Sequence, residues 1–191
     1  MKTESKIINL FIEKKESLTI RELAKQIKSD YRITYTAVQK LLEKKVILAQ
    51  TVGKSTLCSL NKDYYGPEIY IVEEKRKETL LKNKNLEVLY TEIMSNLKTA
   101  QFTFLLFGSY AKGKQTKHSD IDLCFISNDK DFEQKIYNIV SSIPLKIHPL
   151  IFSEKEFNSM KFSREPNIIR EIIQNTYILY GIEPYYRLKN L

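Results

Sequence analysis

LLFGSYAKG (residues 105–113), followed after a basic loop by SDIDL (residues 119–123), is the stretch that decides the fold of this chain. The first segment predicts an apolar strand that ends in a Gly108-Ser109 turn and opens a short helix. The second predicts another apolar strand, which begins with Asp120 and Asp122. Because side chains at positions i and i+2 of a strand point to the same face, we expect these two carboxylates to project together.

Two neighbouring carboxylates repel each other unless a cation lies between them. Mg²⁺ (or Mn²⁺) suits this role, because hard cations bind one or two carboxylates together with the phosphates of a substrate. Gly108 lets the backbone approach a ligand closely, and amides at the start of a helix attract phosphate. Asp120 and Asp122 are therefore the candidate metal ligands and catalytic residues, and Gly108 and Ser109 are the candidate binding residues for a nucleotide.

The loop between the turn and the two acids is basic. Lys112 and Lys117 are candidates for neutralising phosphate charge, and Lys114 and His118 lie in the same loop. A structural alternative stays open for each feature. The acids are then solvated residues at the start of a strand, the turn is an ordinary Gly-Ser turn, and the lysines are solvated loop residues.

Gly108-Ser109, ten further residues and then Asp120-Ile121-Asp122, between two apolar strands, resemble the signature of the minimal nucleotidyltransferases of the DNA polymerase beta superfamily. The resemblance covers roughly residues 85–181. It implies a small α/β domain with a mixed sheet, Mg²⁺ held by the two acids, and a nucleoside triphosphate as substrate. The activity that it implies is transfer of NMP, with AMP as the expected group, from Mg-NTP to a hydroxyl.

The chain departs from this family at the third carboxylate, which active members usually carry on the strand after the next helix. The corresponding segment here, residues 145–152, contains no Asp or Glu, and His148 stands near the expected position. Imidazole can accept a proton near neutral pH, yet it does not replace a carboxylate at a metal site. Glu154 and Glu156 follow the segment, and whether either one turns back to the site stays open.

Residues 1–66 predict three helices followed by a β-hairpin. Apolar periodicity indicates the first helix, a capping-box pattern at Thr19 and Glu22 indicates the second, and a third is expected from about Thr34. This order resembles a winged helix-turn-helix, whose third helix enters the major groove and whose hairpin contacts the DNA backbone. The candidate DNA-binding residues are Arg32, Thr34, Tyr35, Thr36, Gln39, Lys40 and Lys54. Winged helices also serve as protein–protein modules, and that alternative stays open.

The predicted fold class is α+β, with residues 1–66 as a winged helix-turn-helix, 67–83 as a connecting helix and 84–191 as the nucleotidyltransferase-like domain. In the last region we expect helices at about 84–98 and 130–142, helix starts near Glu154 and Glu165-Pro166, and a last apolar run at 177–180. Gly181 is expected to end that run, and no helix is predicted after it.

The chain has 191 residues with a net charge of +8, which is compatible with nucleic acid or nucleotides as partners. Cys58 and Cys124 are expected to be buried thiols rather than a disulfide. No apolar run is long enough for a membrane span, and no signal peptide is visible, so we expect a cytoplasmic protein without membrane contact. A dimer fits this description, but the sequence does not decide the oligomeric state.

Two functional hypotheses follow from the sequence. In the first, the protein is a nucleotidyltransferase coupled to a DNA-binding domain. The resemblance further implies an antitoxin role, with a HEPN-type toxin on another chain as the partner. In the second, it is a DNA-binding regulator whose nucleotidyltransferase domain senses nucleotide without chemistry, because the third acid is missing.

Overall fold

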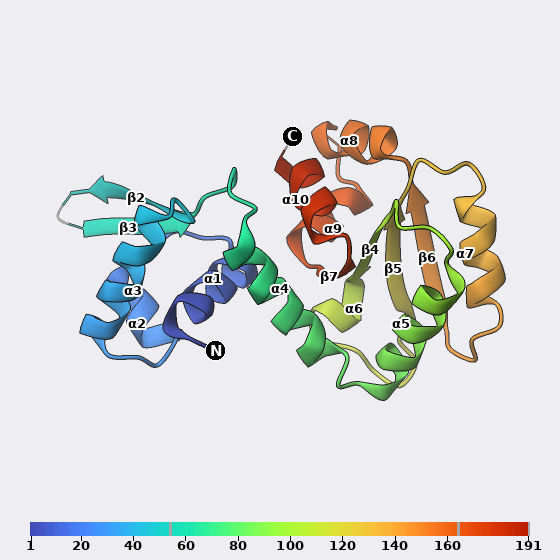
Figure 1. Ribbon diagram of the computed structural model, residues 1–191, viewed down its shortest axis with the longest axis horizontal. Helices are drawn as coiled ribbons and strands as arrows, with labels where there is room; N and C mark the ends of the chain where they lie inside the picture. Colours follow the sequence, from blue (N-terminus) through green and yellow to red (C-terminus); the bar gives the residue numbers. More distant parts are fainter. Residues whose placement is uncertain (54, 164, 191) are drawn as a thin grey trace. The chain divides into compact units, whose positions relative to one another are not determined.

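The computed structural model describes residues 1–53, 55–163 and 165–190. The chain divides into two compact units, Met1–Glu74 and Lys75–Leu191 (Figure 1). The division lies within one helix, α4 (Pro67–Leu80). The segment expected to connect two domains is thus shared between the two units, and each unit is described separately below.

The first unit consists of three helices and a small antiparallel sheet. Its elements are α1 (Thr3–Lys14), β1 (Leu18–Thr19), α2 (Ile20–Gln26), α3 (Tyr31–Glu43), β2 (Ile47–Val52) and β3 (Ser55–Leu60). The strand order is β1-β3-β2, so the expected hairpin of β2 and β3 is extended by a short strand that precedes α2. The expected capping box forms, since the Thr19 side chain accepts from the backbone N–H of Glu22, and the Glu22 side chain accepts from that of Thr19.

Helix α3 begins at Tyr31, three residues before the predicted start at Thr34. The reason is Asp30, whose carboxylate accepts hydrogen bonds from the backbone N–H groups of Arg32 (2.7 Å) and Ile33 (3.4 Å). An acidic N-cap of this kind satisfies donors that would otherwise have no partner in the first turn. The sequence carries this signal, an Asp directly before the helix, so the predicted start at Thr34 is three residues late.

The beginning of α4 is held to the first unit by a polar cluster around Glu68. Its carboxylate accepts a hydrogen bond from Lys44 (2.7 Å) and a short one from the Tyr64 hydroxyl. Burial, followed by the bond to Glu68, raises the pKa of Tyr64 to about 12. The Lys44 and Tyr64 hydrogen bonds lower the pKa of Glu68. Pro67 opens the helix, where a missing N–H has no cost.

The second unit is built on one four-stranded sheet. Its elements after α4 are α5 (Lys84–Asn96), β4 (Thr103–Phe107), α6 (Gly108–Ala111), β5 (Ile121–Ile126), α7 (Phe132–Val140), β6 (Ile147–Phe152), α8 (Glu154–Phe162), α9 (Ile168–Gln174), β7 (Tyr177–Tyr180) and α10 (Ile182–Asn190). The strand order is β6-β5-β4-β7. Strands β5 and β6 are parallel, and β4 is antiparallel to both β5 and β7, which confirms the predicted mixed sheet.

Both faces of this sheet are covered, which explains why its central strands are nearly continuous apolar runs. Phe104, Leu123 and Phe125 pack in one cluster with residues of α5 and α7, two helices that lie side by side against the sheet (Figure 1). On the other face, α10 contacts β4 and β7, and α8 contacts β6. The residues of β5 that alternate with Leu123 and Phe125, Asp122 and Cys124, belong to this second face.

Two features of the second unit differ from the sequence prediction. Helix α9 begins after Asn167, whose side chain accepts from the backbone N–H of Arg170, rather than at Glu165-Pro166. Helix α10 was not predicted, although its Tyr185, Tyr186 and Leu188 are buried. The apolar spacing of this short helix is carried mainly by tyrosines, and its first turn contains Pro184, so the periodicity was not distinctive.

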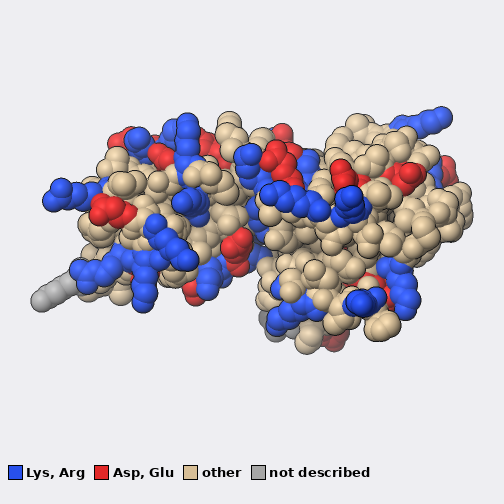
Figure 2. Space-filling model, turned by 90° about the horizontal axis from the view of Figure 1, so that it is seen from below, with Lys and Arg blue, Asp and Glu red and all other residues tan. Residues whose placement is uncertain are grey.

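Both cysteines are buried thiols, as expected. Burial raises the pKa of each of them. No helix among the described residues has the length and apolar character that crossing a membrane requires. Lysine and arginine side chains are spread over the face of the molecule in Figure 2 and outnumber the acidic ones on it. The excess positive charge is thus carried on the surface.

A side chain at Gly181 would meet the backbone of the second unit. Its φ is +79°, and a Cβ would lie 2.9 Å from the Phe102 carbonyl oxygen and 3.1 Å from Thr103 Cα. Gly113 has a similar φ of +63°, but a Cβ there would have no atom within 4 Å. A comparison of alanine variants at Gly181 and Gly113 therefore separates the cost of backbone strain from the cost of steric overlap.

We expect Gly181→Ala to destabilise the protein more than Gly113→Ala. Both changes cost about 1 kcal/mol for a left-handed residue with a side chain, and Gly181→Ala adds roughly 1–3 kcal/mol of overpacking. Urea denaturation followed by circular dichroism measures the difference. Equal losses in the two variants would show that the contact with Phe102 and Thr103 relaxes freely.

Candidate nucleotide-binding and catalytic site

The centre of the candidate site is the contact between Gly108 and Asp122. Phe107, the last residue of β4, pairs with Asp122 on the antiparallel strand β5, which brings the Gly-Ser turn next to this carboxylate. Gly108 has a φ of +70°, and a Cβ on it would lie 1.9 Å from Asp122 Oδ2. Only glycine allows the carboxylate to lie directly against the turn.

Asp120 and Asp122 lie at the start of β5, as the spacing predicts. Asp122 is the second residue of the strand and is half-buried, whereas Asp120 directly precedes the strand and is exposed. The backbone N–H of Ile121, between them, donates to the Lys146 carbonyl oxygen (2.8 Å), which fixes the strand where the two carboxylates leave it. The alternation of β structure places Asp122 on the face opposite to Leu123.

His148 lies beside Asp122 on the neighbouring strand. The two residues are partners in the parallel register of β5 and β6, and His148 Nδ1 is 3.4 Å from Asp122 Oδ1. The imidazole is exposed, and β6 is an edge strand in which His148 is followed by Pro149. The residue that stands near the family position of the third acid is therefore in contact with one of the two candidate metal ligands.

Glu154 and Glu156 lie beyond the opposite end of β6. Glu154 follows His148 by six positions along a mostly extended chain, which corresponds to a distance of about 20 Å. The Glu156 carboxylate is also committed locally, because it accepts hydrogen bonds from the backbone N–H and the hydroxyl of Ser153 (both 2.8 Å). These two bonds lower the pKa of Glu156. Neither acid is placed to complete a site at Asp122.

The predicted phosphate-binding lysines have different surroundings. Lys112, at the C-cap of α6, donates to the Glu171 carboxylate on α9, with 2.6 Å between Nζ and Oε1. Lys117 is exposed in the loop, as are Lys114 and His118. Glu171 was not singled out from the sequence, because it is 59 positions from Lys112 and the sequence carries no local signal of the contact.

Two contacts hold α9 and the start of β7 near the end of β4. The Thr176 hydroxyl donates to the Leu106 carbonyl oxygen (3.0 Å), one residue before the end of that strand. Arg76 on α4 lies 4.5 Å from the centre of the Tyr177 ring and donates to the Thr176 carbonyl oxygen (3.3 Å). Sequence reasoning missed Arg76 for the same reason that it missed Glu171.

In the first unit, the predicted DNA-binding residues do not all lie on the surface. Arg32, Tyr35, Thr36 and Lys40 are exposed on α3, and Gln39 is half-buried. Tyr35 stacks on Tyr31, with 6.4 Å between the ring centres.

Two of the predicted DNA-binding residues need separate comment. Thr34 is fully buried, and its hydroxyl donates to the Asp30 carbonyl oxygen (2.8 Å), so it faces the interior of the unit rather than a ligand. Lys54 lies outside the described residues.

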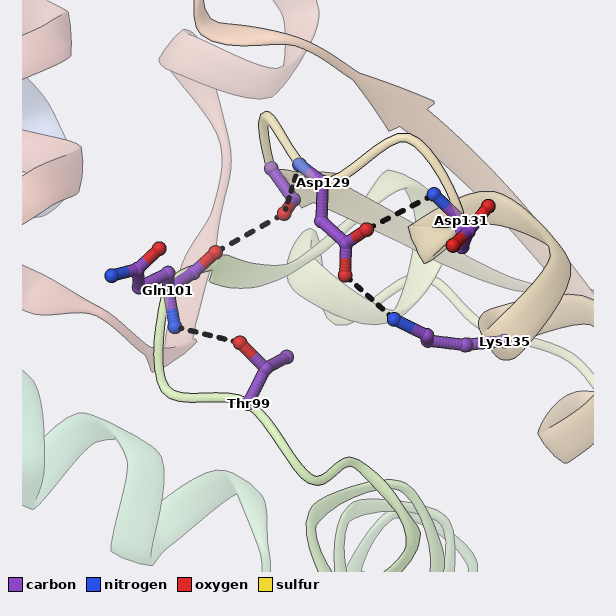
Figure 3. A network of polar contacts seen from close by, with 6 residues as sticks. Thr99, Gln101, Asp129, Asp131 and Lys135 are labelled. Carbon is purple, nitrogen blue, oxygen red and sulfur yellow. Dashed lines mark hydrogen bonds and ion pairs between the residues drawn. The ribbon is translucent and has the colours of Figure 1, made fainter.

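A cavity of about 540 Å³ lies at the other end of the two central strands, where β4 begins and β5 ends. Its charged lining residues are Asp129 and Glu154. Figure 3 shows the hydrogen bonds of this wall: the Ser127 hydroxyl donates to the Gln101 carbonyl oxygen, and Asp129 accepts from Lys135 and from the Asp131 N–H. The Lys135 bond, followed by the Asp131 one, lowers the pKa of Asp129. The Ser127 bond joins the end of β5 to the segment before β4, and the Asp129 bonds tie the following loop to the start of α7, so the network supports the fold around the sheet.

Residues 90–184 match the family described as "Polymerase beta, Nucleotidyltransferase". This segment covers nearly all of the sheet, the Gly-Ser turn, both acids and His148. The second unit therefore contains a nucleotidyltransferase domain.

Two known proteins are similar to parts of the chain. A protein of Methanocaldococcus jannaschii named "Putative protein adenylyltransferase" is 34% identical over 82 residues, which are 43% of this chain and 57% of that protein. The match thus spans little more than half the length of the relative. A structure titled "Crystal structure of the toxin-antitoxin with AMP-PNP" aligns with 56% of this chain and 80% of that one, with a TM-score of 0.38 and 16% identity.

Replacing Gly108 tests whether the turn and Asp122 act as one unit. Gly108→Ala forces the Asp122 carboxylate away from the turn, and we expect binding of a Mg-nucleotide to weaken about 10- to 100-fold, as when a metal ligand loses its support. Isothermal titration calorimetry with a non-hydrolysable ATP analogue measures the change. Gly113→Ala, which has the same left-handed backbone but no neighbouring carboxylate, is the control and should bind like wild type. Wild-type affinity in Gly108→Ala would contradict the assignment.

Proposed function

We propose that the protein transfers a nucleoside monophosphate, with AMP as the group, from Mg-NTP to a hydroxyl of an acceptor molecule. The observation that carries this proposal is the contact between Gly108 and Asp122 in a domain that matches the nucleotidyltransferase family. The three atoms nearest to a Cβ on Gly108 all belong to the Asp122 carboxylate and its Cβ, so glycine lets the backbone and the carboxylate share one point, as a site that holds phosphate and metal together requires.

The two acids fit a divalent cation that is completed by substrate. Mg²⁺ is held by one or two carboxylates and retains positions for phosphate oxygens and water. Asp120 and Asp122 would hold the ion, which would neutralise charge on the triphosphate. Among the residues described, no group of three or more His, Cys, Asp and Glu side chains is arranged as a closed metal cage. This finding is consistent with a site in which two acids bind the ion and phosphate oxygens of the substrate complete its coordination.

The chain's own residues have separate tasks in this proposal. The backbone of Gly108 and Ser109 binds and orients the triphosphate, and Lys112 and Lys117 are the cations available for phosphate. The acceptor oxygen forms a bond to the α-phosphorus as the bond to the pyrophosphate oxygen breaks, and pyrophosphate leaves. His148 Nε2 accepts the hydroxyl proton, because Nδ1 faces Asp122. A histidine base in place of a third carboxylate predicts slow transfer.

The acceptor that we favour is a hydroxyl of a protein, because the relative from M. jannaschii is named a protein adenylyltransferase. A nucleic-acid end and a small molecule are the other acceptor classes with a suitable hydroxyl. The resemblance to minimal nucleotidyltransferases extends the proposal to an antitoxin that modifies a HEPN-type toxin on a separate chain. Modification of such a partner in a lysate of the native host would identify it.

Transfer of label from ATP with a radioactive α-phosphate tests this function. We expect wild type, with Mg²⁺ or Mn²⁺, to label a protein in host lysate, and Asp120→Asn/Asp122→Asn to label nothing. ATP labelled on the γ-phosphate is the control, because nucleotidyl transfer leaves that phosphate in pyrophosphate. Absence of α-label transfer by a protein that still binds ATP would contradict the enzyme and favour a nucleotide-sensing regulator.

We further propose that the first unit is a winged helix-turn-helix that binds DNA. The supporting observations are the order of its elements, with α2 and α3 followed by the β2–β3 hairpin, and the exposed polar residues on α3. Arg32, Tyr35, Thr36, Gln39 and Lys40 are the candidate contacts, and Lys54 is the candidate in the hairpin turn. Thr34 is left out because it is buried. The alternative is a module that binds protein through the same surface.

The effect of Arg32→Ala tests the DNA-binding proposal. After selection of a binding sequence from random DNA with the full chain, we expect the variant to bind that sequence more weakly. If Arg32 contacts phosphate, the plot of log affinity against log salt should become less steep, with its negative slope reduced in magnitude by about 0.9. Lys130→Ala, an exposed change of the same charge in the second unit, is the control. If no sequence is enriched, or if both variants behave alike, the protein-binding alternative is favoured.

A further inference from the structure

Lys112, which the proposed function assigns to phosphate binding, forms an ion pair with Glu171 in this structure. Lys112 Nζ is 2.6 Å from Glu171 Oε1, and the side chains are 35% and 40% exposed. Both groups can therefore be reached by a solute. The pair joins α6, the helix that starts at Gly108, to α9, which follows in the chain much later.

Lys112 is anchored next to the Gly-Ser turn. Its backbone N–H donates to the Gly108 carbonyl oxygen (3.2 Å), so its side chain starts one helical turn from the proposed phosphate site. A lysine side chain has several rotatable bonds and can change direction without any movement of the backbone. Lys112 therefore has a backbone that is fixed beside the turn and a side chain that can change direction.

Glu171, the other member of the ion pair, has a fixed backbone position. It lies between Ile169 and Ile172, which are both fully buried, so α9 cannot rotate without exposing apolar side chains. The hydrogen bond from Thr176 to Leu106 joins the segment after α9 to β4, two residues before Gly108. The glutamate is therefore held close to the turn, while the lysine can move.

The charges around the turn make this contact a competitor for nucleotide. Asp120, Asp122 and Glu171 are carboxylates, and the Lys112 charge is offset by Glu171. A triphosphate that reaches Gly108 attracts the same ammonium with several oxygens. Because a half-exposed ion pair contributes little free energy, a polyphosphate can displace the carboxylate.

We propose that Glu171 is a positioning residue that holds Lys112 in the nucleotide-free protein and releases it to the phosphates of bound nucleotide. This inference rests on the proposed nucleotide site at Gly108 and Ser109. It adds a regulatory contact to that site: part of the nucleotide's binding free energy is used to break the ion pair, so the nucleotide binds more weakly than it would without Glu171.

A double-mutant cycle on the full chain tests the inference. Calorimetry with Mg²⁺ and an ATP analogue carrying a methylene group between the α- and β-phosphates gives the dissociation constants of wild type, Glu171→Gln, Lys112→Met and the double variant. We expect Glu171→Gln to bind about two- to fivefold more tightly, which is the range of an exposed ion pair. We expect Lys112→Met to bind more weakly, and Glu171→Gln to have no further effect in that background.

The matched control is Glu183→Gln, which removes the same charge from another exposed ion pair of the second unit, with Arg187 (2.7 Å). Wild-type affinity in this control excludes a general effect of net charge. Unchanged or weaker binding by Glu171→Gln, in a wild-type protein that binds the analogue, would overturn the inference alone. Failure of the wild-type protein to bind the analogue would overturn the proposed function as well.

Discussion

The close approach of Gly108 to Asp122 is the constraint on which the rest of the site depends. It requires a glycine with a left-handed backbone at the end of β4, and it requires the register in which Phe107 pairs with Asp122. A shift of β5 by one residue would turn Asp122 toward the α5–α7 face and remove the carboxylate from the turn. The apolar residues on both faces of the sheet thus determine the register that the polar site needs.

Much of the fold could be predicted from local patterns. The apolar runs on either side of the basic loop predicted β4 and β5, and the spacing of Gly108-Ser109 and Asp120-Ile121-Asp122 predicted their association and the family. The sequence indicated only that His148 stands near the family position of the third acid, and its pairing with Asp122 became visible in the parallel register of β5 and β6. Errors occurred where a local signal was weak or misread, as at Asp30, which caps α3, and in α10, where tyrosines carry the apolar face.

Contacts between distant segments could not be predicted in this way. Glu171 and Arg76 approach the end of β4 only because α9, β7 and α4 are packed there, and no spacing rule connects them to Gly108. Conversely, Glu154 and Glu156 are near His148 in sequence but lie at the other end of a strand. In the first unit, the burial of Thr34 could not be predicted either, because its neighbours on α3 are mostly polar and Thr34 is nevertheless fully buried.

Pro149, which follows His148, has a consequence for how other chains can approach. Strand β6 forms the edge of the sheet, and such an edge normally offers a row of N–H and C=O groups to which a foreign strand can pair. Proline has no N–H, so the row is interrupted next to the imidazole. A protein presenting a hydroxyl to the site would therefore have to dock through its side chains, and strand addition, with its risk of aggregation, is disfavoured at this edge.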